Sequence, residues 1–405
     1  MLAVLVAVAI VAAACGSDGA EETDRHGFFE DALVSAAVPS VIQIAGDLAY
    51  GHACALFSNG GVKCWGEGDY GELGRGDTDY IGDEPMEMGA FLPYVDLGTG
   101  RTATAITTGE EHSCALLDGG DVKCWGNSED WGASGQGYEG DIGEEPGEMG
   151  DSLAVIDLGT GLTAVAIAAG SWHNCAILDD GSVKCWGYNE YAALGLGRLE
   201  YGVGESTGEM GDALPVVDLG TGRTAKAIEG GEWHTCAILD NDDLKCWGYD
   251  EAGELGYPDI ISYDNDPSRM IGDVPGEMGD ALPAVDLGVG LTVVQVSGGD
   301  DMTCALFSNT RVKCWGENDD GELGLGDDHA RGNHSGEMGD ALPFLDFGTG
   351  ADGNPLGALA VAAGDDFGCV ILIGGDVKCW GENNRGVHSL PNRPRIASMV
   401  SWPRC

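Results

Sequence analysis

Short segments in which apolar and polar residues alternate recur along the chain and predict β-strands. HNCAIL (173–178) and VKCWG (183–187) alternate in this way, are rich in β-forming residues, and are separated by a DDG turn. AVAIAA (164–169) precedes them, and PVVDLG (215–220) follows in a connecting segment. We therefore expect four short strands in each such unit and an all-β chain.

The unit occurs six times. The tripeptide Cys-Trp-Gly recurs at intervals of 60, 61, 61, 68 and 65 residues, and variants of the connector GEMGDALPVVDLGTG (208–222) separate the copies. Four strands in about 60 residues, repeated radially, are typical of a propeller blade, whereas solenoids usually have shorter periods and terminal caps. The sequence predicts a single β-propeller over residues 40–405, with repeat cores near 41–76, 103–137, 164–197, 225–257, 292–326 and 358–390.

The repeat resembles that of the regulator-of-chromosome-condensation (RCC1) family. The resemblance rests on matches in the third copy at Gly170, His173, Ala176, Trp186, Gly187, Asn189 and the LGLG of 194–197. It implies a propeller, usually of seven blades, whereas six are counted here, and seven remain possible. LPNRPRIASMV (390–400) resembles the connector strand missing before the first blade. It predicts a ring closed by exchange of terminal strands.

Two cysteines ten residues apart flank the turn of every repeat. Residues equidistant from a hairpin turn lie opposite each other, within reach of a disulfide at some ladder positions. We expect one disulfide per blade, in the pairs Cys54 and Cys64, Cys114 and Cys124, Cys175 and Cys185, Cys236 and Cys246, Cys304 and Cys314, and Cys369 and Cys379. Zinc bound by His173, Cys175 and Cys185 is the alternative. Cys405 is left without a partner unless Cys15 pairs with it.

Other side chains also recur at fixed repeat positions, which favours a structural role over a catalytic one. The tryptophans are expected in the core, with a sugar-binding platform as the alternative: Trp65, Trp125, Trp186, Trp247, Trp315 and Trp380. The histidines are expected to be structural rather than general bases: His52, His112, His173 and His234. The lysines before the second cysteines are expected to contact carboxylates or aromatic rings between blades.

The composition and the N-terminus indicate export. Fourteen cysteines are unusual for a reducing cytosol. Residues 1–14 have the length of a signal-peptide apolar region and end in small residues before Cys15, as in a bacterial lipobox, although no basic residue precedes them. We expect acylation of Cys15, a flexible tether over 15–39, and a location in the bacterial cell envelope, meaning an outer-membrane lipoprotein, the periplasm or the cell surface. A net charge of −49 argues against nucleic acid and acidic membranes as partners, so a lipid anchor is the one membrane contact expected.

These patterns favour a non-catalytic, monomeric binding scaffold whose variable acidic loops, 257–272 among them, recognise a protein or glycan. No GxSxG, HExxH, Walker or Rossmann motif is present, and no catalytic or metal site is assigned. The alternatives are a secreted hydrolase or lyase acting on glycan, and guanine-nucleotide exchange, which the family resemblance implies but the export signals disfavour. No cofactor is expected, although acidic loops such as 317–329 and 263–273 leave calcium as a weak alternative.

Overall fold

The computed structural model describes residues 39–46, 51–128, 131–137, 140–258, 269–382 and 400–401. Its strands form six antiparallel sheets. In chain order the sheets contain β1 (Val41–Gly46), β2 (His52–Phe57) and β3 (Val62–Gly66); β4 (Ala103–Thr108), β5 (His112–Leu117) and β6 (Val122–Gly126); β7 (Ala164–Ala169), β8 (His173–Leu178), β9 (Val183–Asn189) and β10 (Glu200–Val203); β11 (Ala225–Gly230), β12 (His234–Leu239), β13 (Leu244–Tyr249) and β14 (Met270–Ile271); β15 (Val293–Gly298), β16 (Met302–Phe307) and β17 (Val312–Gly316); and β18 (Ala358–Ala363), β19 (Phe367–Leu372), β20 (Val377–Gly381) and β21 (Val400–Ser401). Three short 3-10 helices lie in connectors: η1 (Gly211–Ala213), η2 (Gly279–Ala281) and η3 (Gly339–Ala341).

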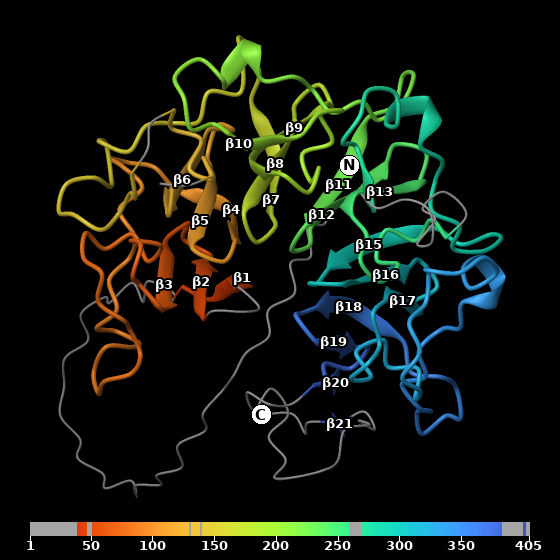
Figure 1. Cartoon of the computed structure of the whole chain (residues 1–405). Helices are drawn as coiled ribbons and strands as arrows, with labels where there is room; N and C mark the ends of the chain where they lie inside the picture. The colour runs from red at the N-terminus through yellow and green to blue at the C-terminus, as the bar shows by residue number, and fades with distance from the viewer. Residues whose placement is uncertain are drawn as a thin grey trace, which may run out of the picture.

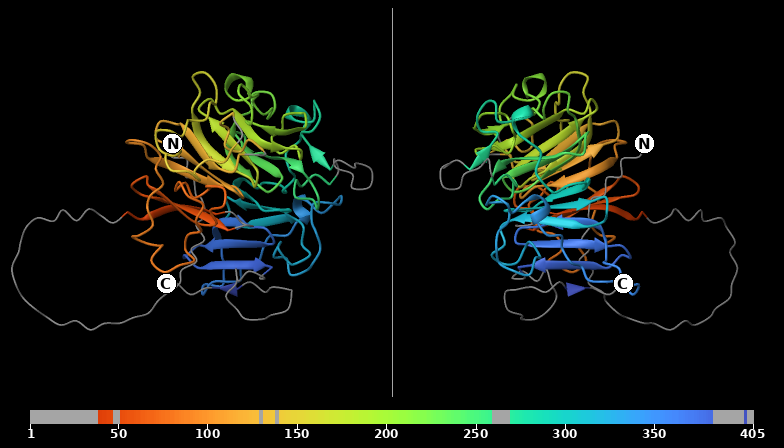
Figure 2. Two further views of the ribbon diagram at one scale, coloured as in Figure 1. Left: turned by 60° about the vertical axis from the view of Figure 1, so that its left-hand side comes forward. Right: turned by 90° about the vertical axis from the view of Figure 1, so that its right-hand side faces the viewer.

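The sheets follow one another in chain order around a common centre (Figures 1 and 2). The first strand of each sheet lies innermost, and each of these strands contacts the first strand of the next sheet, from β1 and β4 to β15 and β18. The all-β propeller of six repeats predicted from the sequence is thereby confirmed. Within the described residues, no helix is long and apolar enough to cross a membrane.

One disulfide joins the second and third strands of every sheet. The register of each hairpin places its two cysteines directly opposite each other, as with Cys175 and Cys185 between β8 and β9. All six pairs are joined, with Cα–Cα distances of 4.0–4.1 Å. The predicted pairing of residues ten apart is confirmed, and the sulfurs are therefore not available as metal ligands. Cys15 and Cys405 lie outside the described residues.

The fourth strand of a sheet is not the one that the sequence pattern predicted. PVVDLG (215–220) forms no strand, and it is held to β9 by a backbone hydrogen bond from Val217 to Val183. The segment after the Gly-Leu-Gly tail pairs with the third strand instead, as in β10 and β14. Sheet one has a single bridge at this place, between Gly66 and Ile81. The connector must pass from one sheet to the next. Along this path its backbone is extended but does not enter the hydrogen-bond ladder of either sheet.

The C-terminal strand also differs from the prediction. β21 pairs with β20 of the sixth sheet, where it occupies the outer place that β10 and β14 take in theirs. It does not join the first sheet, so the described strands show no exchange between the terminal blades. Residues 390–399 of the predicted strand lie outside the described part of the chain.

The repeated connectors interlock on the outside of the ring. Asp151 accepts hydrogen bonds from the backbone N and the Oγ1 of Thr99, at 2.8 and 2.7 Å, so that one connector caps the preceding one. The same contact joins Thr160 to Asp212 and Thr221 to Asp280. These aspartates belong to the recurring Gly-Asp of the connectors, which explains why the connectors repeat as regularly as the strands.

The repeated lysines bind backbone carbonyl groups of the connectors. Lys123 Nζ donates to the carbonyl oxygens of Leu97 and Gly150, at 3.1 and 2.7 Å, and so bridges two successive connectors. The predicted contact with an aromatic ring is found at Lys63, whose Nζ lies 4.9 Å from the ring centroid of Tyr94. Lys245 and Lys313 bridge two connectors in the same way, whereas Lys63, Lys184 and Lys378 each donate to one connector carbonyl.

Candidate functional site

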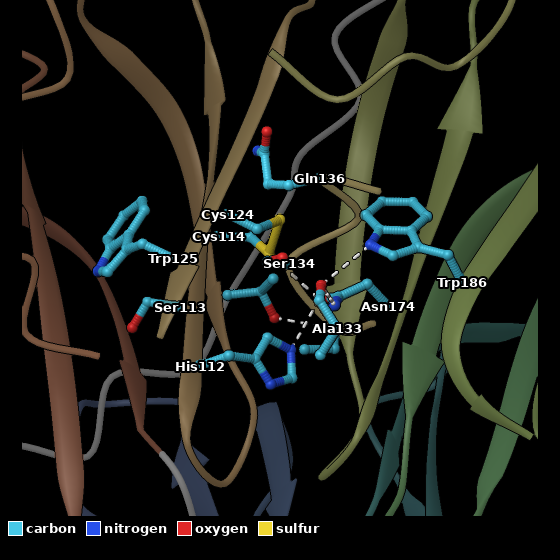
Figure 3. The surroundings of a disulfide bond; sticks show 12 residues. His112, Ser113, Cys114, Cys124, Trp125, Ala133, Ser134, Gln136, Asn174 and Trp186 are labelled. Carbon is cyan, nitrogen blue, oxygen red and sulfur yellow. Dashed lines mark hydrogen bonds between the residues drawn. A yellow bond between two sulfur atoms is a disulfide. The ribbon is translucent and has the colours of Figure 1, made fainter. Parts of the chain in front are cut away.

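Neighbouring blades are joined by a buried hydrogen-bond network that involves the repeated histidines and tryptophans (Figure 3). His112 Nε2 bonds to Asn174 Oδ1 of the next sheet at 3.0 Å, and Asn174 Nδ2 donates to the carbonyl oxygen of Ala133 at 2.9 Å. Trp186 Nε1 donates to the same carbonyl oxygen at 3.1 Å. One backbone acceptor of the second repeat is therefore held by two side chains of the third.

This network recurs around the ring with small changes. Ser113, Thr235 and Thr303 take the place of Asn174, and each bonds to the histidine of the preceding sheet. The fifth and sixth repeats carry Met302 and Phe367 instead of histidine. Gly368, which has no polar side chain, occupies the partner position next to the Met302 sheet.

Burial lowers the pKa of all four imidazoles, to about 3 for His52 and His173 and to about 4 for His112 and His234. The rings are therefore neutral near pH 7. Trp125, Trp186, Trp247, Trp315 and Trp380 have no exposed surface, whereas Trp65 of the first sheet is partly exposed. The four histidines and the five fully buried tryptophans lie between blades.

One end of the propeller, here called the loop face, is where the repeats differ. It consists of the loops between the first and second strands and the segments after the third, because the second hairpin turn lies at the opposite end. In each sheet the residue after Trp-Gly donates its backbone N–H to the carbonyl group of the residue before the histidine position. This bond places two side chains together in every sheet, in the pairs Gly51 and Glu67, Glu111 and Asn127, Trp172 and Tyr188, Trp233 and Tyr249, Asp301 and Glu317, and Asp366 and Glu382.

Aromatic side chains gather over the third and fourth sheets at this face. The aromatic cluster consists of Trp131, Trp172, Tyr188, Tyr191, Tyr201, Trp233 and Tyr249. All seven are at least partly exposed, and Tyr201 retains 53% of its surface. Ring centroids lie 4.0 Å apart for Trp131 and Trp172 and 4.7 Å apart for Tyr191 and Trp233. These contacting, partly exposed rings are a candidate contact surface for a partner.

Carboxyl groups take the same places in the fifth and sixth sheets. Burial, followed by repulsion from neighbouring carboxylates, raises the pKa of Asp300 to about 7, of Asp301 to about 8 and of Asp366 to about 6. Side-chain hydrogen bonds join Asp300 to Asp365, Asp301 to Glu317, and Asp366 to Glu382. With these raised pKa values, Asp300, Asp301 and Asp366 are partly protonated near pH 7.

Within the described residues, no group of three or more His, Cys, Asp or Glu side chains is arranged to hold a metal ion. Residues 259–268, which include much of the variable loop 257–272 and of the acidic loop 263–273, lie outside the described part of the chain. Calcium binding by acidic loops therefore stays untested.

Glu229 places a carboxyl group near the end of β11, where its counterparts Thr107 and Ser297 accept hydrogen bonds from the next sheet. Desolvation of its carboxyl group raises the pKa of Glu229 to about 8, although the residue as a whole keeps part of its surface exposed, so the folded protein keeps a proton that the unfolded chain loses near its ordinary pKa of 4.5. Raising the pH from about 5 to 8 therefore destabilises the fold, by up to about 1.4 kcal/mol per pH unit from this group.

We expect Glu229→Gln to remove this cost. Its free energy of unfolding should exceed that of the unmodified protein increasingly between pH 5 and 8, with no further gain at higher pH. Denaturant unfolding at a series of pH values measures the difference, with Glu84→Gln at an exposed position as the control. A constant difference across the pH range would contradict the assigned burial.

Sequence reasoning placed the repeated residues and missed the aromatic cluster. Trp172 and Trp233 stand where other repeats have Gly51, Glu111 or Asp301, so a signal was present in the alignment of the six copies. Aromatic residues that interrupt a repeat consensus at surface positions are stronger indicators of recognition than those that conform to it.

The family model for the regulator of chromosome condensation (RCC1) repeat matches the chain six times, at residues 50–72, 103–130, 164–192, 225–254, 293–322 and 359–387. The chain belongs to the RCC1-repeat family. All six matches coincide with the blades, and the RCC1 resemblance drawn from the sequence is confirmed.

Among RCC1-repeat relatives, the chain is 29% identical to the protein pim1 of Schizosaccharomyces pombe over 67% of its own length and 46% of the relative. It is 28% identical to the ultraviolet-B receptor UVR8 of Arabidopsis thaliana, over 65% of its length and 51% of the receptor. The chain thus spans about half the length of these relatives. The structure of yeast RCC1 (Prp20) bound to Kap60 superimposes with a TM-score of 0.62 at 18% identity, covering 89% of this chain and 74% of that one. This last likeness supports the fold alone.

Proposed function

We propose that this chain is a non-catalytic interaction scaffold of the bacterial cell envelope that meets a protein partner through its loop face. The observation that carries the proposal is the contrast between two sets of repeat positions. Residues between blades recur in nearly every copy, whereas the paired positions of the loop face change from aromatic to acidic. A rigid ring with one variable face is the usual design of propellers that act by recognition.

An extracytoplasmic location is supported by the six disulfides, because cytosolic reductants keep cysteine pairs in the reduced thiol form. The export segment (residues 1–14), the acylated Cys15 and the tether (residues 15–39) remain part of the proposal, and residues 1–38 lie outside the described part of the chain. Guanine-nucleotide exchange is not proposed, because an oxidising compartment does not suit it and no exchange motif maps onto the repeats.

The role of the loop face is tested by a loop-face variant, in which the paired positions of sheets three and four carry the Glu and Asn that sheet two has at Glu111 and Asn127. The variant combines Trp172→Glu, Tyr188→Asn, Trp233→Glu and Tyr249→Asn, and Asn127 Nδ2 already bonds to Glu111 Oε2 at 2.7 Å in sheet two. Because the ring carries this pair once, we expect the variant to fold and to lose its partners in capture from envelope extracts, with mass spectrometry of the bound proteins.

The control changes the opposite face by Asp180→Asn and Asn241→Asp, which are exchanges between repeat-equivalent turn positions. It should retain every partner of the unmodified protein. If the loop-face variant retained the same partners as this control, the proposed function would be wrong.

A glycan hydrolase or lyase is the second candidate, and the convergence of carboxyls with raised pKa near Asp300 and Asp301 favours it. These groups bond to one another instead of facing each other across a cavity. A cavity of about 340 Å³ lies elsewhere, beside Tyr94 and Glu145. Release of reducing sugar that Asp300→Asn abolishes would establish the enzyme; no release from envelope glycans would leave the scaffold.

A further inference from the structure

The aromatic cluster lies within an acidic surrounding. The Tyr188 hydroxyl donates to Glu190 at 2.8 Å, and the Tyr249 hydroxyl bonds to Glu251. Glu251 in turn acts on Asp301 and so continues the cluster into the carboxyl groups of sheet five. Two arginines accompany the cluster: Arg198 is paired with Glu200 at 2.6 Å, and Arg269, whose charge acts on Tyr249, donates from Nη1 to the backbone carbonyl oxygen of Glu251 at 3.2 Å. The field over these rings is therefore negative, in a chain whose net charge is −49.

The planes of neighbouring rings in the aromatic cluster are steeply inclined to one another rather than parallel. Neighbouring planes meet at 68° for Trp131 and Trp172, at 61° for Tyr188 and Trp233, and at 53° for Tyr191 and Tyr249. A sugar ring stacks best on a flat, open aromatic face, whereas a cation is attracted to the faces of several rings set at angles around it. The indole N–H groups of Trp172 and Trp233 have no hydrogen-bond partner among the described residues, and because they only donate they can bind the backbone carbonyl oxygens of a peptide but not its cationic side chains.

We propose that the aromatic cluster and the carboxylates beside it bind the cationic side chains of an arginine-rich segment of a protein partner. This inference rests on the proposed function, because it assumes that the loop face is the surface that meets the partner. The cluster extends from Trp131, after sheet two, to Tyr249 at the end of β13. An extended segment with several cations fits this span better than a single small cation.

The test uses a fluorescent nona-arginine peptide at about 0.15 M salt, where the screening length is about 8 Å and distant charges contribute little. We expect Trp233→Leu and Tyr191→Leu each to weaken binding about tenfold, because each removes one cation–π contact. Phe91→Leu is the matched control, because Phe91 is 67% exposed and lies in the first connector. It should leave the affinity unchanged.

Hydrogen–deuterium exchange on the unmodified protein provides a readout that does not depend on how a variant folds. The peptide should protect 170–173, 188–191 and 231–234, and a Gly-Ser nonapeptide should not. Equal loss in Trp233→Leu and Phe91→Leu, or protection spread over the whole surface, would mean general attraction by charge and would overturn the inference.

Binding of chitotriose, lost in Trp233→Leu, without binding of nona-arginine would also overturn it, by showing that the cluster recognises glycan. The proposed function would still hold after either result, provided that the loop-face variant (Trp172→Glu, Tyr188→Asn, Trp233→Glu and Tyr249→Asn) still loses its envelope partners. Conversely, unchanged capture by that variant, together with specific peptide binding, would refute the proposed function and leave a cation-binding surface.

Discussion

Trp186→Ala should lower the free energy of unfolding by about 3–5 kcal/mol, the usual cost of removing a fully buried tryptophan. Trp186 has no exposed surface, and its indole N–H donates across the blade junction to Ala133. Truncation leaves both a cavity and a carbonyl group with one donor fewer. Denaturant unfolding monitored by circular dichroism measures the loss, provided that the slope with denaturant is unchanged.

Trp65→Ala is the internal control, because it makes the same chemical change at the same repeat position. Trp65 is partly exposed, and its indole has no hydrogen-bond partner among the described residues, which omit residues 383–399 and with them the segment of the sixth repeat equivalent to the one that carries Ala133. We expect a clearly smaller cost. If both substitutions cost the same, the tryptophans act within their own blades and the junction network is misassigned.

Reduction of the disulfides should unfold the protein at 37 °C. Each bond closes a loop of ten residues' separation, for which the loss of chain entropy in the unfolded state corresponds to somewhat under ~3 kcal/mol. Six such contributions rival the whole free energy of unfolding of a domain, about 5–15 kcal/mol. Thermal melting with and without a phosphine reductant, at equal ionic strength, measures the effect.

Removing one disulfide instead of all six measures the contribution of a single bond to the free energy of unfolding. Cys175→Ala combined with Cys185→Ala should cost no more than one loop's contribution and leave a folded ring. If full reduction left the melting temperature unchanged, the disulfides would be dispensable, and most of the stability would have to come from the blade junctions and the interlocked connectors.

The framework of the fold was predictable because it is local and repeated. A separation of ten residues with a turn at its midpoint defines a hairpin register, and six copies leave little freedom for another architecture. The connector was mispredicted because PVVDLG has the composition of a strand while its path between sheets forbids a ladder. A tertiary constraint overrode the local preference.

The loop face could not be predicted in the same way. Trp131 and Trp172 lie on different repeats, and their contact depends on how neighbouring sheets are set side by side. The residues that bond to the histidines across the blade junctions were partly predictable. The position before the first cysteine is polar in repeats two to five, at Ser113, Asn174, Thr235 and Thr303. Their roles became clear only once the histidine of the preceding sheet was seen to lie against them.

The measurement that bears most directly on the whole account is peptide mass mapping of the oxidised, full-length protein under non-reducing conditions. A ring of six equivalent sheets requires six cystines, each joining residues ten apart within one repeat. Cross-links between different repeats, or free thiols at these twelve positions, would contradict the sheet register, the propeller and the oxidising compartment together.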